Sequence, residues 1–92
     1  MIVLDLVLKA HWYDLIKSGQ KKCEYREVKP YWTKRLFAKP YSHVRFRRGY
    51  TKESMVFELA GIEETTDQND LNFPRVYKLT LGAMVEAQCK NN

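Results

Sequence analysis

The sequence predicts a mainly β, α+β fold: a small, compact β-barrel of five to six short strands, with two short helices near one end. Three observations support this class. Apolar and polar residues alternate over several short segments, which is typical of strands, and two other segments have helical spacing. The chain has 92 residues without a break in composition, which indicates a single domain over residues 1–92 with a small core.

The first two elements are expected to be a strand and a short helix. Residues Ile2–Leu8 form a nearly continuous apolar run, which is typical of a largely buried strand. Trp12, Leu15 and Ile16 then recur at helical spacing, and the Ser-Gly pair at 18–19 indicates a glycine stop. We expect this two-turn helix to pack its Trp12, Leu15 and Ile16 side chains against the body of the protein.

The next strand is expected over Lys21–Val28, where residue character changes with a period of two. Cys23 and Tyr25 fall on one face, and Glu24 and Arg26 fall on the other. We expect Cys23 to lie in the core beside Tyr25, because no histidine stands at a spacing that would mark the thiol as a nucleophile.

A second short helix is expected to begin at Pro30 and to end at Pro40. Trp32, Leu36 and Phe37 fall on one side of it. Trp32 stands among basic residues. Its side chain could stack on a nucleic-acid base or pack in the protein, and the sequence favours neither role over the other. For Trp12, which shares a helical stripe with apolar residues, packing is the favoured interpretation.

The third strand is expected over His43–Arg48. Val44 and Phe46 should point inward, and Arg45 and Arg47 outward, about 7 Å apart along one face. Outward arginines are candidates for phosphate contacts, and they also protect an edge strand from aggregation.

Two further strands and a loop complete the predicted sheet. Met55–Ile62 is the fourth strand, with a bulge or bend at Gly61. The acidic and polar segment Glu63–Asn72 is the best loop candidate. A fifth strand begins at Tyr77, Gly82 interrupts it, and it continues after the bend.

Charge is distributed unevenly along the chain. The net charge is +5, but residues 17–52 contain twelve basic residues against two acidic ones, and the remainder is acidic on balance. Such a segment indicates a basic face, for which phosphates are the commonest partner. An ordinary solvated surface explains the composition equally well.

The remaining composition favours a cytoplasmic, monomeric protein with neither a metal nor a cofactor. The N-terminal run is too short for a membrane span and lacks the features of a signal peptide. Cys23 and Cys89 are expected to be reduced thiols, and no metal-ligand spacing connects them with His11 or His43. Residues Lys90–Asn92 are expected to form a flexible tail.

One segment concentrates the candidate chemistry. Gly19, Lys21, Glu24 and Arg26 follow the spacing G-x-K-x-x-E-x-R where the first helix ends and the second strand begins. A fixed cation, a carboxylate and a cation of tunable pKa can together bind a polar ligand or move a proton.

This motif, with the preceding W-Y-D-L-I-K-S-G segment and the later Y-K-L-T-L-G strand, resembles the ASCH domain family, part of a PUA-like β-barrel superfamily. The resemblance covers residues 2–87. It implies a PUA-like barrel with a cleft into which the motif residues point, and ligands such as RNA or nucleotides.

Some members of that family are small amidohydrolases that deacylate modified cytidine, and others resemble ribonucleases. In the amidohydrolases the motif lysine is retained, a threonine is the nucleophile, and a further acid lies in a longer segment before the last strand. This chain has Glu24 where the threonine falls and only Glu63–Phe73 in place of that segment. The threonine mechanism is therefore not carried over.

Three functions follow as hypotheses. The leading one is a nucleic-acid-binding or nucleotide-binding module, with RNA as the favoured ligand in a basic cleft. The second is a hydrolase acting on an acylated nucleoside or on RNA, with Glu24 as general base and Lys21 stabilising negative charge. The third is a protein-interaction module for an acidic partner. The candidate ligand-binding residues are Gly19, Lys21, Glu24, Arg26, Trp32, Arg35, Arg45 and Arg47.

Overall fold

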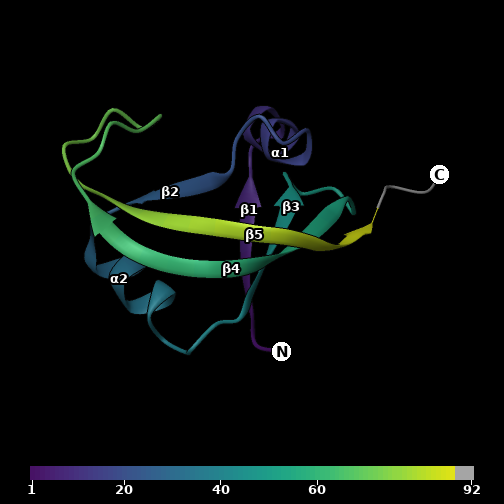
Figure 1. The fold of residues 1–92 in the computed structure, drawn as a ribbon, viewed down its shortest axis with the longest axis horizontal. Helices are drawn as coiled ribbons and strands as arrows, with labels where there is room; N and C mark the ends of the chain where they lie inside the picture. The colour runs from purple at the N-terminus through teal and green to yellow at the C-terminus, as the bar shows by residue number, and fades with distance from the viewer. Residues whose placement is uncertain (89–92) are drawn as a thin grey trace.

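The computed structural model describes residues 1–88 and consists of one curled sheet with two short helices (Figure 1). The elements are β1 (Val3–Leu8), α1 (Ala10–Lys17), β2 (Cys23–Glu27), α2 (Pro30–Leu36), β3 (His43–Arg48), β4 (Ser54–Thr65) and β5 (Val76–Gln88). The predicted small, mainly β class with two short helices is confirmed. The predicted tail Lys90–Asn92 and the residue Cys89 lie outside the described part of the chain.

The sheet is a half-barrel in which the order of the strands is β1-β3-β4-β5-β2. β1 pairs with β3 in parallel, and the three other pairings are antiparallel. β4 and β5 form a long curved ribbon, and α1 and α2 lie at the two ends of β2 (Figure 1). β1 and β2 therefore stand at opposite ends of the strand order, although they are neighbours in the sequence.

The core lies on the concave face of this sheet. Alternate residues of β1 and β3 point into it, and both helices cover it with buried side chains. Its buried members are Leu4, Leu6, Leu8, Tyr13, Ile16, Leu36, Val44, Phe46, Met55, Phe57, Tyr77 and Leu79. In β3 the predicted alternation is confirmed, because Val44 and Phe46 are fully buried and Arg45 and Arg47 point outward.

Both helices bury fewer of their predicted residues than the spacing suggests. In α1 the buried residues are Tyr13 and Ile16, whereas Trp12 and Leu15 are half-buried, so only Ile16 of the predicted stripe belongs to the core. The helix is rotated so that Tyr13, one residue further along, faces the core. In α2 only Leu36 is buried; the helix ends there, and Phe37 is 54% exposed.

The β4–β5 ribbon differs from the prediction at its loop end. β4 continues to Thr65, so the first residues of the predicted loop Glu63–Asn72 are strand, and the connecting segment is 66–75. The register shifts between Val56 and Gly61, which confirms the bulge predicted near Gly61. These irregularities bend the ribbon and direct segment 66–75 toward β2.

Candidate functional site

The register of β2 determines which way its charged residues point. Glu24 pairs with Leu79 and Arg26 pairs with Tyr77, and both of these partners belong to the core. Directly paired residues point to the same side of a sheet, so Glu24 and Arg26 lie on the concave face. The prediction that Cys23 lies in the core is wrong, because its side of the strand faces outward and it is only partly buried.

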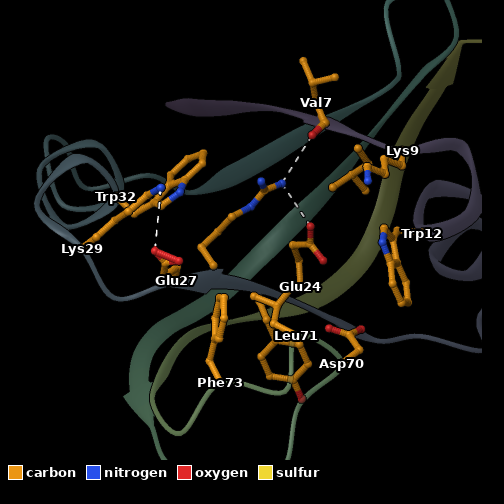
Figure 2. Close-up of a pocket in the computed structure, with 13 residues that line it drawn as sticks. Val7, Lys9, Trp12, Glu24, Glu27, Lys29, Trp32, Asp70, Leu71 and Phe73 are labelled. Atoms are coloured by element: carbon orange, nitrogen blue, oxygen red, sulfur yellow. Dashed lines mark hydrogen bonds and ion pairs between the residues drawn. The ribbon is translucent and has the colours of Figure 1, made fainter.

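A cavity of about 400 Å³ opens over this part of the concave face. Its walls come from β1, α1, β2, α2 and segment 66–75. The lining residues are Val7, Leu8, Lys9, Trp12, Glu24, Tyr25, Arg26, Glu27, Lys29, Trp32, Asp70, Leu71 and Phe73. Figure 2 shows Trp12 and Trp32 on opposite sides of Glu24. We call this cavity, with these residues, the tryptophan cleft.

Lys21 lies beside the tryptophan cleft and connects its acidic groups. It forms ion pairs with Asp70 and with Glu24, whose Oε1 lies 3.6 Å from the Lys21 Nζ. The ammonium group also lies 5.3 Å from the centre of the Trp12 ring and 4.9 Å from that of Tyr25. Because only 9% of its side chain is exposed, these contacts largely replace water around the charge.

Glu24 is a buried carboxylate with two cations beside it. It is 7% exposed, and its Oε2 accepts a hydrogen bond of 3.0 Å from Arg26. Burial raises the pKa of Glu24 above its usual range, and the neighbouring Arg26 and Lys21 oppose that rise only in part. A carboxyl group in this environment exchanges its proton closer to neutral pH than an exposed one.

Arg26 links β2 to β1, the two strands at opposite ends of the strand order. Its guanidinium donates to Glu24 and also to the Val7 carbonyl of β1, at 3.4 Å, and it lies 4.8 Å from the centre of the Trp32 ring. Burial lowers the pKa of Arg26, and the Glu24 carboxylate opposes this shift. The group stays charged, because a guanidinium does not lose its proton in proteins.

The free edge of β1 is covered by two arginines. Odd-numbered carbonyl groups of β1 point away from β3, and such unpaired groups otherwise favour aggregation. Arg26 donates to the carbonyl of Val7, and Arg35 from α2 donates to the carbonyl of Asp5. The two arginines thus take the place of a neighbouring strand.

The eight predicted ligand-binding residues fall into three groups. Glu24, Arg26 and Trp32 line the tryptophan cleft, and Lys21 contacts two of its acids. Gly19 (φ +85°) provides the left-handed turn that brings Lys21 back toward β2. Arg35 lies at the β1 edge, and Arg45 and Arg47 lie on the convex face of the sheet.

Asp70 and Trp12 also line the cleft, although the sequence pattern does not predict Asp70 as a site residue and favours packing for Trp12. Asp70 belongs to a segment that was predicted only as an acidic loop, and its contact with Lys21 spans 49 positions. Asn69 positions this segment, since its buried side chain bonds to the backbone of Asp67, Leu71 and Phe73. An asparagine-aspartate pair in the last loop is the only sequence signal that pointed to this acid.

The tryptophan cleft is close to neutral, contrary to the expectation of a basic cleft. Its lining contains three basic side chains (Lys9, Arg26 and Lys29) and three acidic ones (Glu24, Glu27 and Asp70). Within residues 1–88, no three His, Cys, Asp or Glu side chains are grouped to bind a metal. The cleft therefore offers aromatic faces, hydrogen-bond donors and hydrogen-bond acceptors in balance.

A second cavity of about 480 Å³ lies on the other side of Lys21. Trp12, Tyr25 and Asp70 line both cavities, and Cys23 lines only this one. A hydrogen bond with the Cys23 side chain raises the pKa of Tyr25 to about 12. The raised pKa strengthens the preference for the neutral phenol, which can donate a hydrogen bond.

Comparisons of this chain with models of protein families, with curated proteins and with solved structures found no match. Among the described residues, neither helix has the length and apolar character needed to cross a membrane.

Proposed function

We propose that this protein is an ASCH-like module that binds a nucleotide unit in the tryptophan cleft, with RNA as the favoured ligand. The observation that carries the proposal is the pair of tryptophans on opposite sides of a buried Glu24–Arg26 pair (Figure 2). Aromatic faces stack on any base, at about 1–3 kcal/mol per base. The carboxylate accepts hydrogen bonds from base amino or imino groups, and the cations donate to base carbonyl groups.

The size and charge of the cleft favour the base rather than the phosphate as the inserted group. A volume of about 400 Å³ lies in the range of small-molecule sites. Its lining charges balance, and the adjacent Lys21 is paired with Glu24 and Asp70, so little positive charge is left for a phosphate group. A planar, uncharged and polar base matches a neutral cleft with aromatic walls.

Tryptophan fluorescence provides a direct test of binding. The chain contains two tryptophans, and both line the cleft. An equimolar mixture of the four ribonucleoside 5′-monophosphates should quench their emission saturably. Trp32→Ala should weaken binding about tenfold through loss of one stacking face, measured by calorimetry.

Phe37→Ala is the matched control, because it removes an exposed aromatic ring outside the cleft. It should leave binding unchanged. If the wild-type protein binds neither the nucleotides nor RNA, but binds an acidic protein with a salt-sensitive affinity, the nucleotide proposal is wrong and the protein-interaction hypothesis replaces it.

A second candidate function, hydrolysis, is favoured by the contacts of Lys21. Glu24 has a raised pKa and touches Lys21, which also contacts Asp70. With an acylated nucleoside, Glu24 would accept a proton from water as the water oxygen attacks the amide carbonyl. Lys21 would stabilise the resulting oxyanion, and the C–N bond would break as that proton passes to the departing amine.

Turnover separates the two functions. Release of product from acylated cytidine or from RNA should disappear in Glu24→Gln and persist in Lys39→Ala, at an exposed position outside the cleft. The rate should rise with pH through the raised pKa of Glu24, because the general base must be ionised. Binding without turnover in the wild-type protein would exclude the hydrolase.

A further inference from the structure

A second group of basic residues lies outside the tryptophan cleft, on the convex face of the sheet. A cavity of about 460 Å³ there is lined by Arg45, Arg47, Thr51, Lys52, Ser54 and Gln88. None of these six described residues is acidic. This cavity, which we call the basic cavity, therefore has the excess positive charge that the tryptophan cleft lacks.

Strand register explains why these residues meet. Arg47 pairs with Val7 on one side and with Ser54 on the other, and Ser54 pairs with Gln88. A row of four side chains therefore crosses β1, β3, β4 and β5 on the convex face: Val7, Arg47, Ser54 and Gln88. Lys52 is supplied by the turn between β3 and β4.

The cations of the basic cavity differ in whether they form an ion pair with an acidic side chain. Arg45 is 3.1 Å from Asp5 on the neighbouring strand. Arg47 and Lys52 form no ion pair with any residue among 1–88, and both are exposed. Two cations without an ion pair in this described range, beside one partly neutralised arginine, are suited to binding phosphates.

A third, small cavity at the free edge of β1 shares a lining residue with each of the two regions. It measures about 130 Å³ and is lined by Asp5, Leu6, Val7, Arg35 and Arg47. Val7 also lines the tryptophan cleft, and Arg47 also lines the basic cavity. The three hollows therefore lie next to one another along the edge of β1.

We propose that the ligand is a single-stranded RNA several nucleotides long, whose backbone follows this route. This inference rests on the proposed function. One unpaired base enters the neutral tryptophan cleft, the chain crosses the β1 edge past Val7 and Arg35, and the following phosphates contact Arg47 and Lys52. A base within a duplex is paired and stacked, so a single strand is the form that can supply both the inserted base and the extended phosphates.

The experiment compares ligands of different length. The probes are the mixture of nucleoside 5′-monophosphates and random-sequence RNA of two, four and six nucleotides, followed by tryptophan fluorescence. Affinity should rise with length. The double variant Arg47→Ala with Lys52→Ala should weaken binding of the six-nucleotide RNA about tenfold or more and leave the mononucleotides unchanged.

Salt dependence gives an independent readout. Loss of two phosphate contacts should reduce the slope of log affinity against log salt by about 1.4 for single-stranded RNA. The matched control is Lys39→Ala with Arg75→Ala, which removes the same charge from positions that line neither the cleft nor the basic cavity. This control should preserve both the affinity and most of the slope.

The outcomes are distinguishable from those for the proposed function. If the six-nucleotide RNA binds no more tightly than a mononucleotide, or if the Arg47/Lys52 variant binds it as the wild-type protein does, the RNA route is wrong while the cleft proposal stands. If no nucleotide and no RNA binds, both are wrong.

Discussion

Glu24 and Arg26 form a partly buried ion pair in which each charge compensates the other. The two side chains are 9% and 18% exposed, and their carboxylate and guanidinium groups lie 3.0 Å apart. Such a pair contributes little net stability compared with apolar residues, but removing one partner leaves a buried charge uncompensated. The pair is therefore expected to be much more sensitive to single substitutions than to a double one.

Arg26→Ala should lower the free energy of unfolding by about 3 kcal/mol, because Glu24 loses its closest cation. Arg75→Ala is the matched control; it breaks a 3.0 Å pair with Glu64 on the surface, where the effect should be below about 1 kcal/mol. Urea unfolding at pH 7 measures both. Arg26→Met combined with Glu24→Gln should recover most of the loss, and an equal loss in the Arg26 and Arg75 variants would contradict the argument.

The raised pKa of Glu24 predicts a specific pH dependence of stability. Well below pH 4.5, the ordinary pKa of the group, the carboxyl is protonated in both the folded and the unfolded state. As the pH rises from there through the higher folded-state pKa, the folded protein retains a proton that the unfolded chain has released. The free energy of unfolding should therefore fall over this range.

Glu24→Gln isolates this effect, since glutamine has a similar shape and does not titrate. The difference in unfolding free energy, wild type minus Glu24→Gln, should decrease between pH 4 and pH 7 in urea titrations. A difference that increases over that range would show that the cations, rather than burial, dominate the pKa of Glu24.

At the scale of the elements, the turn after α1 depends on one glycine. Gly19 has φ +85°, and the backbone around it donates from Gly19 to Ile16 and from Lys21 to Leu15. Gly19→Ala should lower the free energy of unfolding by about 1 kcal/mol through left-handed strain alone, because an added Cβ meets nothing within 4 Å. Gly61→Ala, at another open position but with no positive φ, should not show this loss.

Segment 66–75 depends on Asn69 in a similar way. Its side chain makes four hydrogen bonds with the backbone of this segment and is 8% exposed. Asn69→Ala should lower the free energy of unfolding by about 2 kcal/mol and speed hydrogen exchange at Leu71 and Phe73, because their amides lose an acceptor. Gln68→Ala, at an exposed neighbouring position, should change neither quantity.

The elements also show which features a sequence can predict. In β3, apolar Val44 and Phe46 contrast so strongly with Arg45 and Arg47 that alternation predicts both faces correctly. In β2 the same period correctly separated Glu24 from Cys23, but polarity suggested the wrong face for the core. The charged face of β2 points toward the concave side, where it lines the cleft. This orientation is set by the register of β2 with β5, which the sequence of β2 alone does not reveal.

At the scale of the whole molecule, the local features of the candidate site were predictable and the long-range ones were not. The motif spacing identified Lys21, Glu24 and Arg26, which do contact one another as a chain of ion pairs. The sequence does not predict that Asp70 joins these three residues, because the position of Asp70 depends on the length of β4 and on the bulges of the β4–β5 ribbon. The separation of a neutral cleft from a basic cavity likewise depends on strand order.

Strand order also has a consequence for the time at which the site forms. β4 and β5 are adjacent in sequence and can pair early, whereas β2 must find β5 across the length of both intervening strands and α2. Pairings between remote segments close large loops and are intrinsically slow. We therefore expect the tryptophan cleft, which needs β1, β2 and segment 66–75 together, to assemble after the β4–β5 ribbon. A ligand that needs the complete cleft would then bind only the fully folded protein and would raise its apparent stability.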